Sequence, residues 1–273
     1  MLNLASDAEF LYEPVVLSIN ASGGKGVSVV KFSNPFQNPA RIQVSLSEWN
    51  VKQGNKYDLL PKDDPNSILK YIKISPAQFT LEPGKTRNVR IATSIPASFD
   101  DKEYNLFFQM LEIGADRKIL DGPTDAQTLN LNINRQTNAG MYVRKGSGFK
   151  CDLQVPSVNA TKEHFQDKDV EKTILHYDVT YTNSGNVHTR KDIGIRIFDP
   201  SGAVIFEKKY TDTLIAFPTS QTGPITISKK YTLPERLDKD GSYEVEFGFT
   251  PSPDDIDGAS CQEQSVKTGK VKI

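Results

Sequence analysis

The sequence lacks the features that mark several large classes of protein. Its 33 Lys and Arg residues are matched by 34 Asp and Glu residues, which leaves a formal net charge of -1. A protein that binds the phosphate backbone of nucleic acids needs a basic excess, so we expect no nucleic-acid partner. No apolar run approaches the roughly 18 residues that a membrane-spanning helix needs, so we expect no membrane insertion.

Catalytic and metal-binding motifs are absent as well. The histidines His164, His176 and His188 have no paired ligand spacing, and neither cysteine belongs to a Cys-x-x-Cys motif, so we expect no metal site. No nucleophile elbow, P-loop or glycine-rich dinucleotide motif occurs in the sequence. The sequence therefore favours a protein that is not an enzyme and holds no cofactor.

Cysteine is scarce, with only Cys151 and Cys261. On their number alone, a disulfide between them and two free buried thiols both stay open. The first residues, MLNLASDAEFLYEP, lack the basic and apolar regions of a signal peptide. Either the protein is cytosolic, or Met1 stands in place of a signal peptide that has been removed.

What the sequence does contain is a series of short β-strand patterns. Runs rich in β-branched and aromatic residues are separated by turn signals such as ASGGKG, SNPFQNP and EPGK, and no convincing amphipathic helix is found. Strands at this spacing are typical of a β-sandwich. In the first half, the expected strands are 26–32, 41–49, 87–93, 103–113 and 128–135.

A second series of strand patterns follows residue 149, at 174–186, 192–210, 223–233, 241–250 and 265–273. Within it, the segment DPSG at 199–202 predicts a hairpin turn, because Pro fixes φ at the second turn position and Gly accepts a positive φ. We therefore predict an all-β protein with two tandem β-sandwich domains, at residues 1–147 and 148–273.

Four segments of the first half carry a family resemblance when they are taken in order. They are FSNPFQNPARIQVSLSEW (32–49), SPAQFTLEPGKTRNVRI (75–91), DKEYNLFFQMLEI (101–113) and GMYVRKG (140–146). Together they resemble the periplasmic chaperones of the chaperone–usher pathway over roughly residues 10–147, and the second half is similar only as an immunoglobulin-like sandwich. The resemblance implies two immunoglobulin-like domains in an L-shaped arrangement.

The segment 75–91 is expected to serve as scaffold. Phe79 and Leu81 are expected to face the first core, before the Pro83–Gly84 turn. Arg87 and Arg90 lie at odd spacing on the following strand and are expected to point to opposite faces. A buried arginine needs a partner, for which Glu103 is a candidate.

The resemblance also implies a working strand. In the family, alternate apolar side chains on the last strand of the first domain fill a groove in a pilin subunit that lacks its own last strand, which is donor-strand complementation. In TLNLNINR, Leu129, Leu131 and Ile133 are spaced to share one face of a strand. On the pattern alone, the same spacing also fits a strand whose apolar face packs in its own core.

Charged positions show where this chain departs from the family. The family anchors the subunit's C-terminal carboxylate with one cation on the first strand and one on the last. Val16 stands at the expected first-strand position, and Arg135 and Lys145 are the candidates on the last strand. The resemblance further implies that Arg144 and Glu103 pair between the domains; an exposed ion pair of little energetic weight is the alternative.

If the resemblance holds, the chain works in the periplasm after removal of a signal peptide, and its partners are pilin-like subunits and an outer-membrane usher. Because the periplasm is oxidising, Cys151 and Cys261 are then expected to form a disulfide within the second domain. Two other functions stay open. A structural or adhesive protein would bury Leu129, Leu131 and Ile133 in its own core, and an enzyme or sugar-binding sandwich would need a pocket lined by aromatic or acidic side chains.

Overall fold

The computed structural model describes residues 10–14, 16–54, 56–118, 130–167, 170–232, 242–251, 260–263, 266–267 and 271–272. Side chains are described at these positions except at 114–118, 130–133, 164–167, 170–173, 193, 209–214, 242–243, 249–251 and from 260 onward. Within the described residues, α1 (Thr219–Thr222) is the only α-helix, and β-strands make up most of the rest. The expectation of an all-β protein is therefore confirmed.

The chain divides into two compact units. The first is formed by residues up to 50 and 58–147, and the second by residues 51–57 and those from 148 onward. Residues 51–57 join the end of β4 (Ala40–Lys52) to the start of β5 (Lys56–Leu59). They group with the second unit, in which the Gly54 N–H donates to the carbonyl oxygen of Thr222 at 3.2 Å.

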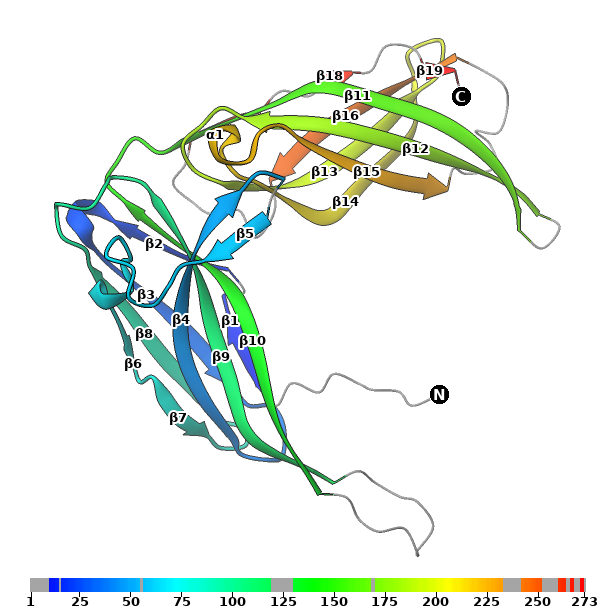
Figure 1. The fold of residues 1–273 in the computed structure, drawn as a ribbon. Helices are drawn as coiled ribbons and strands as arrows, with labels where there is room; N and C mark the ends of the chain where they lie inside the picture. The colour runs from blue at the N-terminus through cyan, green and yellow to red at the C-terminus, as the bar shows by residue number, and fades with distance from the viewer. Residues whose placement is uncertain are drawn as a thin grey trace, which may run out of the picture. The chain divides into compact units, whose positions relative to one another are not determined.

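The first unit consists of two sheets (Figure 1). Sheet A has the strand order β1–β3–β8–β6, formed by Leu11–Glu13, Lys25–Ser33, Thr86–Ser94 and Ile72–Ser75. Sheet B has the order β2–β10–β9–β4–β5, with β7 also paired to β4; the new strands are β2 (Leu17–Ala21), β7 (Gln78–Leu81), β9 (Glu103–Lys118) and β10 (Asn130–Lys145). Consecutive strands β1 and β2 therefore belong to different sheets. Two 3-10 turns, η1 (Ser22–Gly24) and η2 (Leu69–Tyr71), complete the unit.

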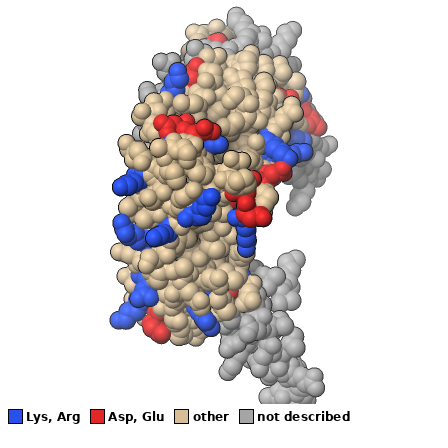
Figure 2. Space-filling view, turned by 60° about the vertical axis from the view of Figure 1, so that its left-hand side comes forward, with Lys and Arg blue, Asp and Glu red and all other residues tan. Residues whose placement is uncertain are grey.

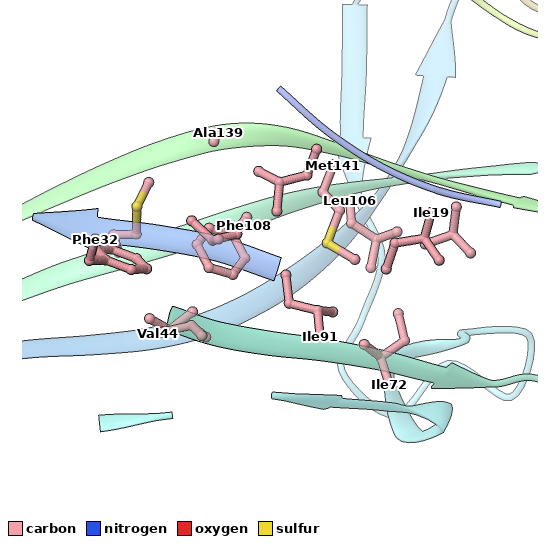
Figure 3. Packing of buried hydrophobic residues seen from close by; sticks show 14 of the residues in the cluster. Ile19, Phe32, Val44, Ile72, Ile91, Leu106, Phe108, Ala139 and Met141 are labelled. Atoms are coloured by element: carbon pink, nitrogen blue, oxygen red, sulfur yellow. The ribbon is translucent and has the colours of Figure 1, made fainter. Parts of the chain in front are cut away.

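The core of the first unit lies between its two sheets, because alternation along each strand turns one face of each sheet inward. Val30 and Phe32 of sheet A and Leu106 and Phe108 of sheet B are fully buried. The Phe32 ring lies 5.3 Å from the ring of Phe79 and 6.4 Å from that of Phe108, centroid to centroid. Figure 3 shows Phe32 and Ile91 of sheet A and Leu106 and Phe108 of sheet B in one buried cluster, so the two sheets form a sandwich.

The segment 75–91 is arranged as predicted, with Arg87 opposite buried Phe32 and Arg90 opposite exposed Val29, on the two faces of sheet A. Phe79 and Leu81 are buried, which confirms their expected place. Arg87 and Arg90 are both exposed, so neither needs a buried partner. The Arg87 guanidinium lies over the Phe79 ring, 5.7 Å from its centroid, because the first residues of β8 lie at the rim of the sandwich.

The second unit is also a sandwich of two sheets, which confirms the prediction of tandem β-sandwiches. One sheet has the order β15–β12–β11–β17, formed by Ile225–Thr232, Val170–Asn183, Lys150–Asp167 and Ser260–Glu263. The other has the order β14–β13–β16–β18, with β19 paired to β16; its strands are Val204–Ala216, Thr189–Phe198, Ser242–Pro251, Val266–Lys267 and Val271–Lys272. The rings of Tyr177 and Phe247, 4.8 Å apart, join the two sheets in the core.

Two local features of the second unit test the strand predictions. The turn at 199–202 is confirmed: Gly202 has φ of 86° and its N–H donates to the Asp199 carbonyl oxygen at 2.9 Å. Strand β11, in contrast, was not predicted. It contains Pro156 within a register shift between Gln154 and Ser157, where the missing N–H removes no regular ladder bond.

Candidate functional site

Strand β10 has different neighbours along its length. On one side it pairs antiparallel with β9 from Asn130 to Arg144. On the other side it pairs parallel with β2, but only from Met141 to Lys145. Among the strand pairings of the described residues, none covers this second edge over residues 130–140. The backbone N–H and C=O groups on that edge are thus placed to pair with a further strand.

The side chains of β10 follow the same division. From Met141 to Lys145 every side chain is buried. From Asn134 to Asn138 the pattern is alternately exposed and half-buried, and Ala139 is the first buried residue after it. The residues beyond the reach of β2 therefore contribute less to the core of the unit than those beside it.

Two of the three predicted donor residues lie at the start of this strand. Leu131 and Ile133 are in β10, opposite Arg117 and Ala115 of β9. Leu129 lies outside the described residues, and the side chains of Leu131 and Ile133 lie outside the described side chains. The shared apolar face of these residues stays a prediction.

Arg135, the first candidate carboxylate anchor, follows a register shift in the β9–β10 pair. It lies directly opposite Glu112 of β9, whose side chain is buried. Opposite charges at facing positions on neighbouring strands stabilise each other modestly. Arg135 is half-buried, on the part of β10 that has no second neighbour strand among the described residues.

Arg144 and Glu103 form an ion pair within the first unit, and their predicted role between the domains stays a prediction. The Arg144 Nε donates to a Glu103 carboxylate oxygen at 2.8 Å, and the two side chains are only 1% and 6% exposed. The alternative of an exposed, weak pair is therefore wrong. A buried pair loses the hydration of both charges, so removal of one partner is costly.

Lys145, the second candidate anchor, is engaged within the first unit. Its ammonium pairs with the Asp101 carboxylate and donates to the Phe99 carbonyl oxygen at 2.8 Å. The lysine side chain is buried. On the first strand, Val16 is half-buried just before β2, and the stretch FLYEPVVLSIN around it contains no Lys or Arg.

The two cysteines lie on adjacent strands of the second unit. Cys151 is buried in β11 and lies opposite Cys261 in the parallel pairing with β17. Neighbouring strands are about 4.8 Å apart, which is within the Cα separation that a disulfide spans. The disulfide stays a prediction. No group of three His, Cys, Asp or Glu side chains suited to a metal occurs in the described part of the chain.

A pocket in the first unit was not foreseen. It has a volume of about 530 Å³, and its lining includes Glu48, Asp64, Phe99, Asp100 and Tyr104. Burial raises the pKa of the Glu48 carboxyl, although hydrogen bonds from the Ser67 hydroxyl at 2.8 Å and the Ile68 N–H at 2.9 Å oppose this shift. The sequence signal was present: Ile42, Val44 and Leu46 point inward, and Glu48 is the next residue with the same spacing.

Two polar groups of this pocket are bonded to the backbone of neighbouring loop residues. The Tyr104 hydroxyl donates to the Asp100 carbonyl oxygen at 2.9 Å, and burial, together with nearby carboxylates, raises the pKa of Tyr104 to about 12. The Asp64 carboxylate accepts from the Asn66 N–H at 2.8 Å. The pocket has the aromatic and acidic lining that an enzyme or sugar-binding sandwich needs, but these contacts serve its own loops.

Comparisons with known proteins find similarity in structure only. No protein-family model and no curated protein matches the chain. It is similar to the chaperone–tip adhesion subunit complex CsuC–CsuE of the archaic Csu pili of Acinetobacter baumannii, at 14% identity and TM-score 0.45, over 95% of this chain and 98% of that chain. It is also similar to the SafA pilin in complex with the SafB chaperone of Salmonella enterica, at 14% identity and TM-score 0.44, over 94% and 95%.

Both structures contain a chaperone and a pilus subunit. In the described residues, no helix is long and apolar enough to cross a membrane.

Proposed function

We propose that this chain is a periplasmic chaperone that holds pilin-like subunits by strand addition along β10 and delivers them to an outer-membrane usher. The observation that carries the proposal is the second edge of β10, which no described strand covers over residues 130–140. Such an edge offers main-chain hydrogen bonds to an incoming strand, and alternate side chains give specificity.

In the proposal, apolar residues at the start of β10 and just before it supply that specificity. Leu129, Leu131 and Ile133 recur at every second position, so they fit alternate sites in a subunit groove. Full burial of each side chain contributes about 1.5–3 kcal/mol. An uncovered apolar edge favours aggregation, and a bound subunit removes that hazard.

The subunit carboxylate is proposed to meet Arg135 rather than a first-strand cation. Arg135 is half-buried and lies on the uncovered part of β10. Lys145 is the second candidate, but its ammonium would have to exchange Asp101 for the subunit carboxylate. Charge-assisted hydrogen bonds of this kind contribute about 1.5–3 kcal/mol.

The remaining parts of the proposal concern the domain boundaries, the ion pair of Arg144 and the two cysteines. We propose residues 1–147 and 148–273 as the two domains, with Arg144 and Glu103 fixing their junction. We also propose a Cys151–Cys261 disulfide, formed in the oxidising periplasm, between β11 and β17. The chain is proposed to act by binding alone, without catalysis or a cofactor.

The test compares two variants of adjacent residues on β10. Leu131→Asp places a charge among the proposed donor residues, and Asn132→Asp places the same charge on the next residue, which strand alternation predicts for the other face. We expect wild type and Asn132→Asp to co-purify from the native periplasm with a small β-rich subunit. Leu131→Asp should remain folded by circular dichroism and lose that subunit.

Two outcomes would reject the chaperone function. If Leu131→Asp unfolds while wild type brings down no subunit, Leu131 belongs to the chain's own core, and the structural or adhesive function takes over. If a subunit co-purifies equally with wild type and both folded variants, the chain binds it through another surface.

A further inference from the structure

The outer face of sheet A carries cations on three neighbouring strands. In β3, Val30 and Phe32 point into the core, whereas Lys25 and Lys31 alternate with them and are exposed. Arg90 of β8 is exposed between buried neighbours. In β6, Lys73 follows buried Ile72 and is exposed. We call this set, Lys25, Lys31, Lys73 and Arg90, the basic face.

The strand register places a small apolar centre within the basic face. Val29 pairs with Arg90, and Val27 pairs with Ala92, which in turn pairs with Lys73. Val27 and Val29 are 53% and 46% exposed, which is high for aliphatic side chains. Lys25 and Lys31 therefore lie at the two ends of these exposed valines along β3, and Arg90 and Lys73 lie on their β8 side.

The charges of the basic face are largely uncompensated. Within the described part of the chain, none of its cations belongs to an ion pair, whereas Arg144, Lys145 and Arg196 all do. The one acid in register with it is Glu13 of β1, opposite Lys31. Figure 2 shows Lys and Arg side chains spread over the lower part of the view, with few acidic ones among them. A chain of net charge -1 thus gathers positive charge on one sheet face.

We infer that the basic face binds the surface of an anionic lipid bilayer, a property that is independent of the strand addition proposed above. Lys25 and Lys31 are six residues apart on one strand, or about 20 Å at about 3.4 Å per residue. Cations spread this far cannot converge on one phosphate. Each can meet a separate lipid headgroup, because headgroups move laterally, and clustered Lys and Arg side chains are attracted to anionic leaflets.

The composition of the face favours lipid over an acidic protein. Protein interfaces are enriched in aromatic residues at their centre, and these usually supply the largest contributions to binding. The centre of the basic face holds only Val27, Val29 and Ala92. Small aliphatic side chains on a sheet face, with cations beside them, suit shallow contact with the headgroup layer of a bilayer.

The test measures partition onto vesicles by sedimentation at low salt. We expect the protein to bind vesicles that contain both phosphatidylglycerol and phosphatidylcholine, and not to bind vesicles of phosphatidylcholine alone. The bound protein should be released in 0.5 M NaCl, because salt screens the attraction between the cations and the anionic lipid. Each cation near such a surface changes the partition coefficient about fivefold. Each reversal to Glu changes the charge by two units, so Lys73→Glu/Arg90→Glu changes it by four and should lower the partition coefficient at least about 100-fold.

The matched control is Lys62→Glu/Lys230→Glu, which changes the net charge equally at exposed positions outside β3, β6 and β8. It should retain most of the binding, and both variants should unfold at the wild-type temperature. Equal loss in both variants, or no binding of wild type to the anionic vesicles, would overturn the inference. So would binding of poly-L-glutamate in place of vesicles, which indicates an acidic protein, or low-salt self-association that the Lys73/Arg90 variant abolishes, which indicates a second copy.

Discussion

The two halves of β10 differ in what surrounds the same strand. From Met141 to Lys145, β10 lies between β2 and β9, and every side chain is buried. From Asn130 to Gly140, only β9 pairs with it among the described strands. One half of the strand is therefore part of the sandwich core, and the other half extends its sheet with one edge open.

This difference separates stability from binding along a single strand. Substitutions in the covered half are expected to destabilise the first unit without acting directly on a partner. Substitutions in the open half are expected to change partner binding at little cost in folding free energy. The predictions below test this division, beginning with the largest expected change.

Loss of the buried ion pair should have the largest effect. Glu103→Ala takes the carboxylate away from Arg144, which is 1% exposed, and removal of one partner of a buried pair costs about 3–5 kcal/mol. Urea denaturation should show this loss as a lower free energy of unfolding. The control is Glu207→Ala, which removes the partner of Arg196 in a pair whose side chains are 52% and 59% exposed and should change nothing measurable. Equal effects in the two variants would contradict the burial of the Arg144 pair.

A comparison within β10 should show the next largest effect. Met141 is fully buried beside β2, so Met141→Ala should cost about 2–4 kcal/mol through lost contacts and a residual cavity. Thr137, half-buried in the open half, should lose less than about 1 kcal/mol on change to Ala. Thermal and urea unfolding of both variants measure the difference. A Thr137→Ala variant as destabilised as Met141→Ala would mean that the open half is packed like the covered half.

The smallest effect concerns Glu48, on β4 and away from the open edge. Its pKa is raised chiefly by burial, so the folded state holds its proton more tightly than the unfolded state does. As pH rises from the ordinary carboxyl pKa through the raised one, this group should therefore lower the free energy of unfolding. Glu48→Gln should flatten that part of the pH–stability curve and leave subunit binding unchanged. A curve identical to wild type would show that the carboxyl titrates normally.

The sequence predicted those strands and turns whose local residue pattern is regular. Alternating strands and Pro-Gly or Asp-Pro-Ser-Gly turns are local signals, and they located the inward Phe79 and the turn at Gly202. Strand β11 was not predicted because Pro156 and its polar neighbours interrupt the alternation of apolar and polar residues. The sheet change between β1 and β2 depends on tertiary pairing, which no local pattern encodes.

The candidate site was predictable in part. The contact between Arg144 and Glu103 followed from the family resemblance, but its burial did not, because burial depends on what packs over both side chains. The pairing of Lys145 with Asp101 was likewise not predicted, because a lysine near the end of a strand is usually exposed. The open edge of β10 depends on where β2 ends, a property of the sheet rather than of the strand.

Amide hydrogen exchange of the free protein, read residue by residue along β10, tests the open edge most directly. In an antiparallel edge strand only alternate N–H groups bond to the neighbour, and the others face outward. We predict strong protection for residues 141–145, and alternating protection with fast exchange at every second amide over 130–140. Uniform protection of 130–140 in the free protein would mean that another strand covers this edge, and would contradict strand addition along β10.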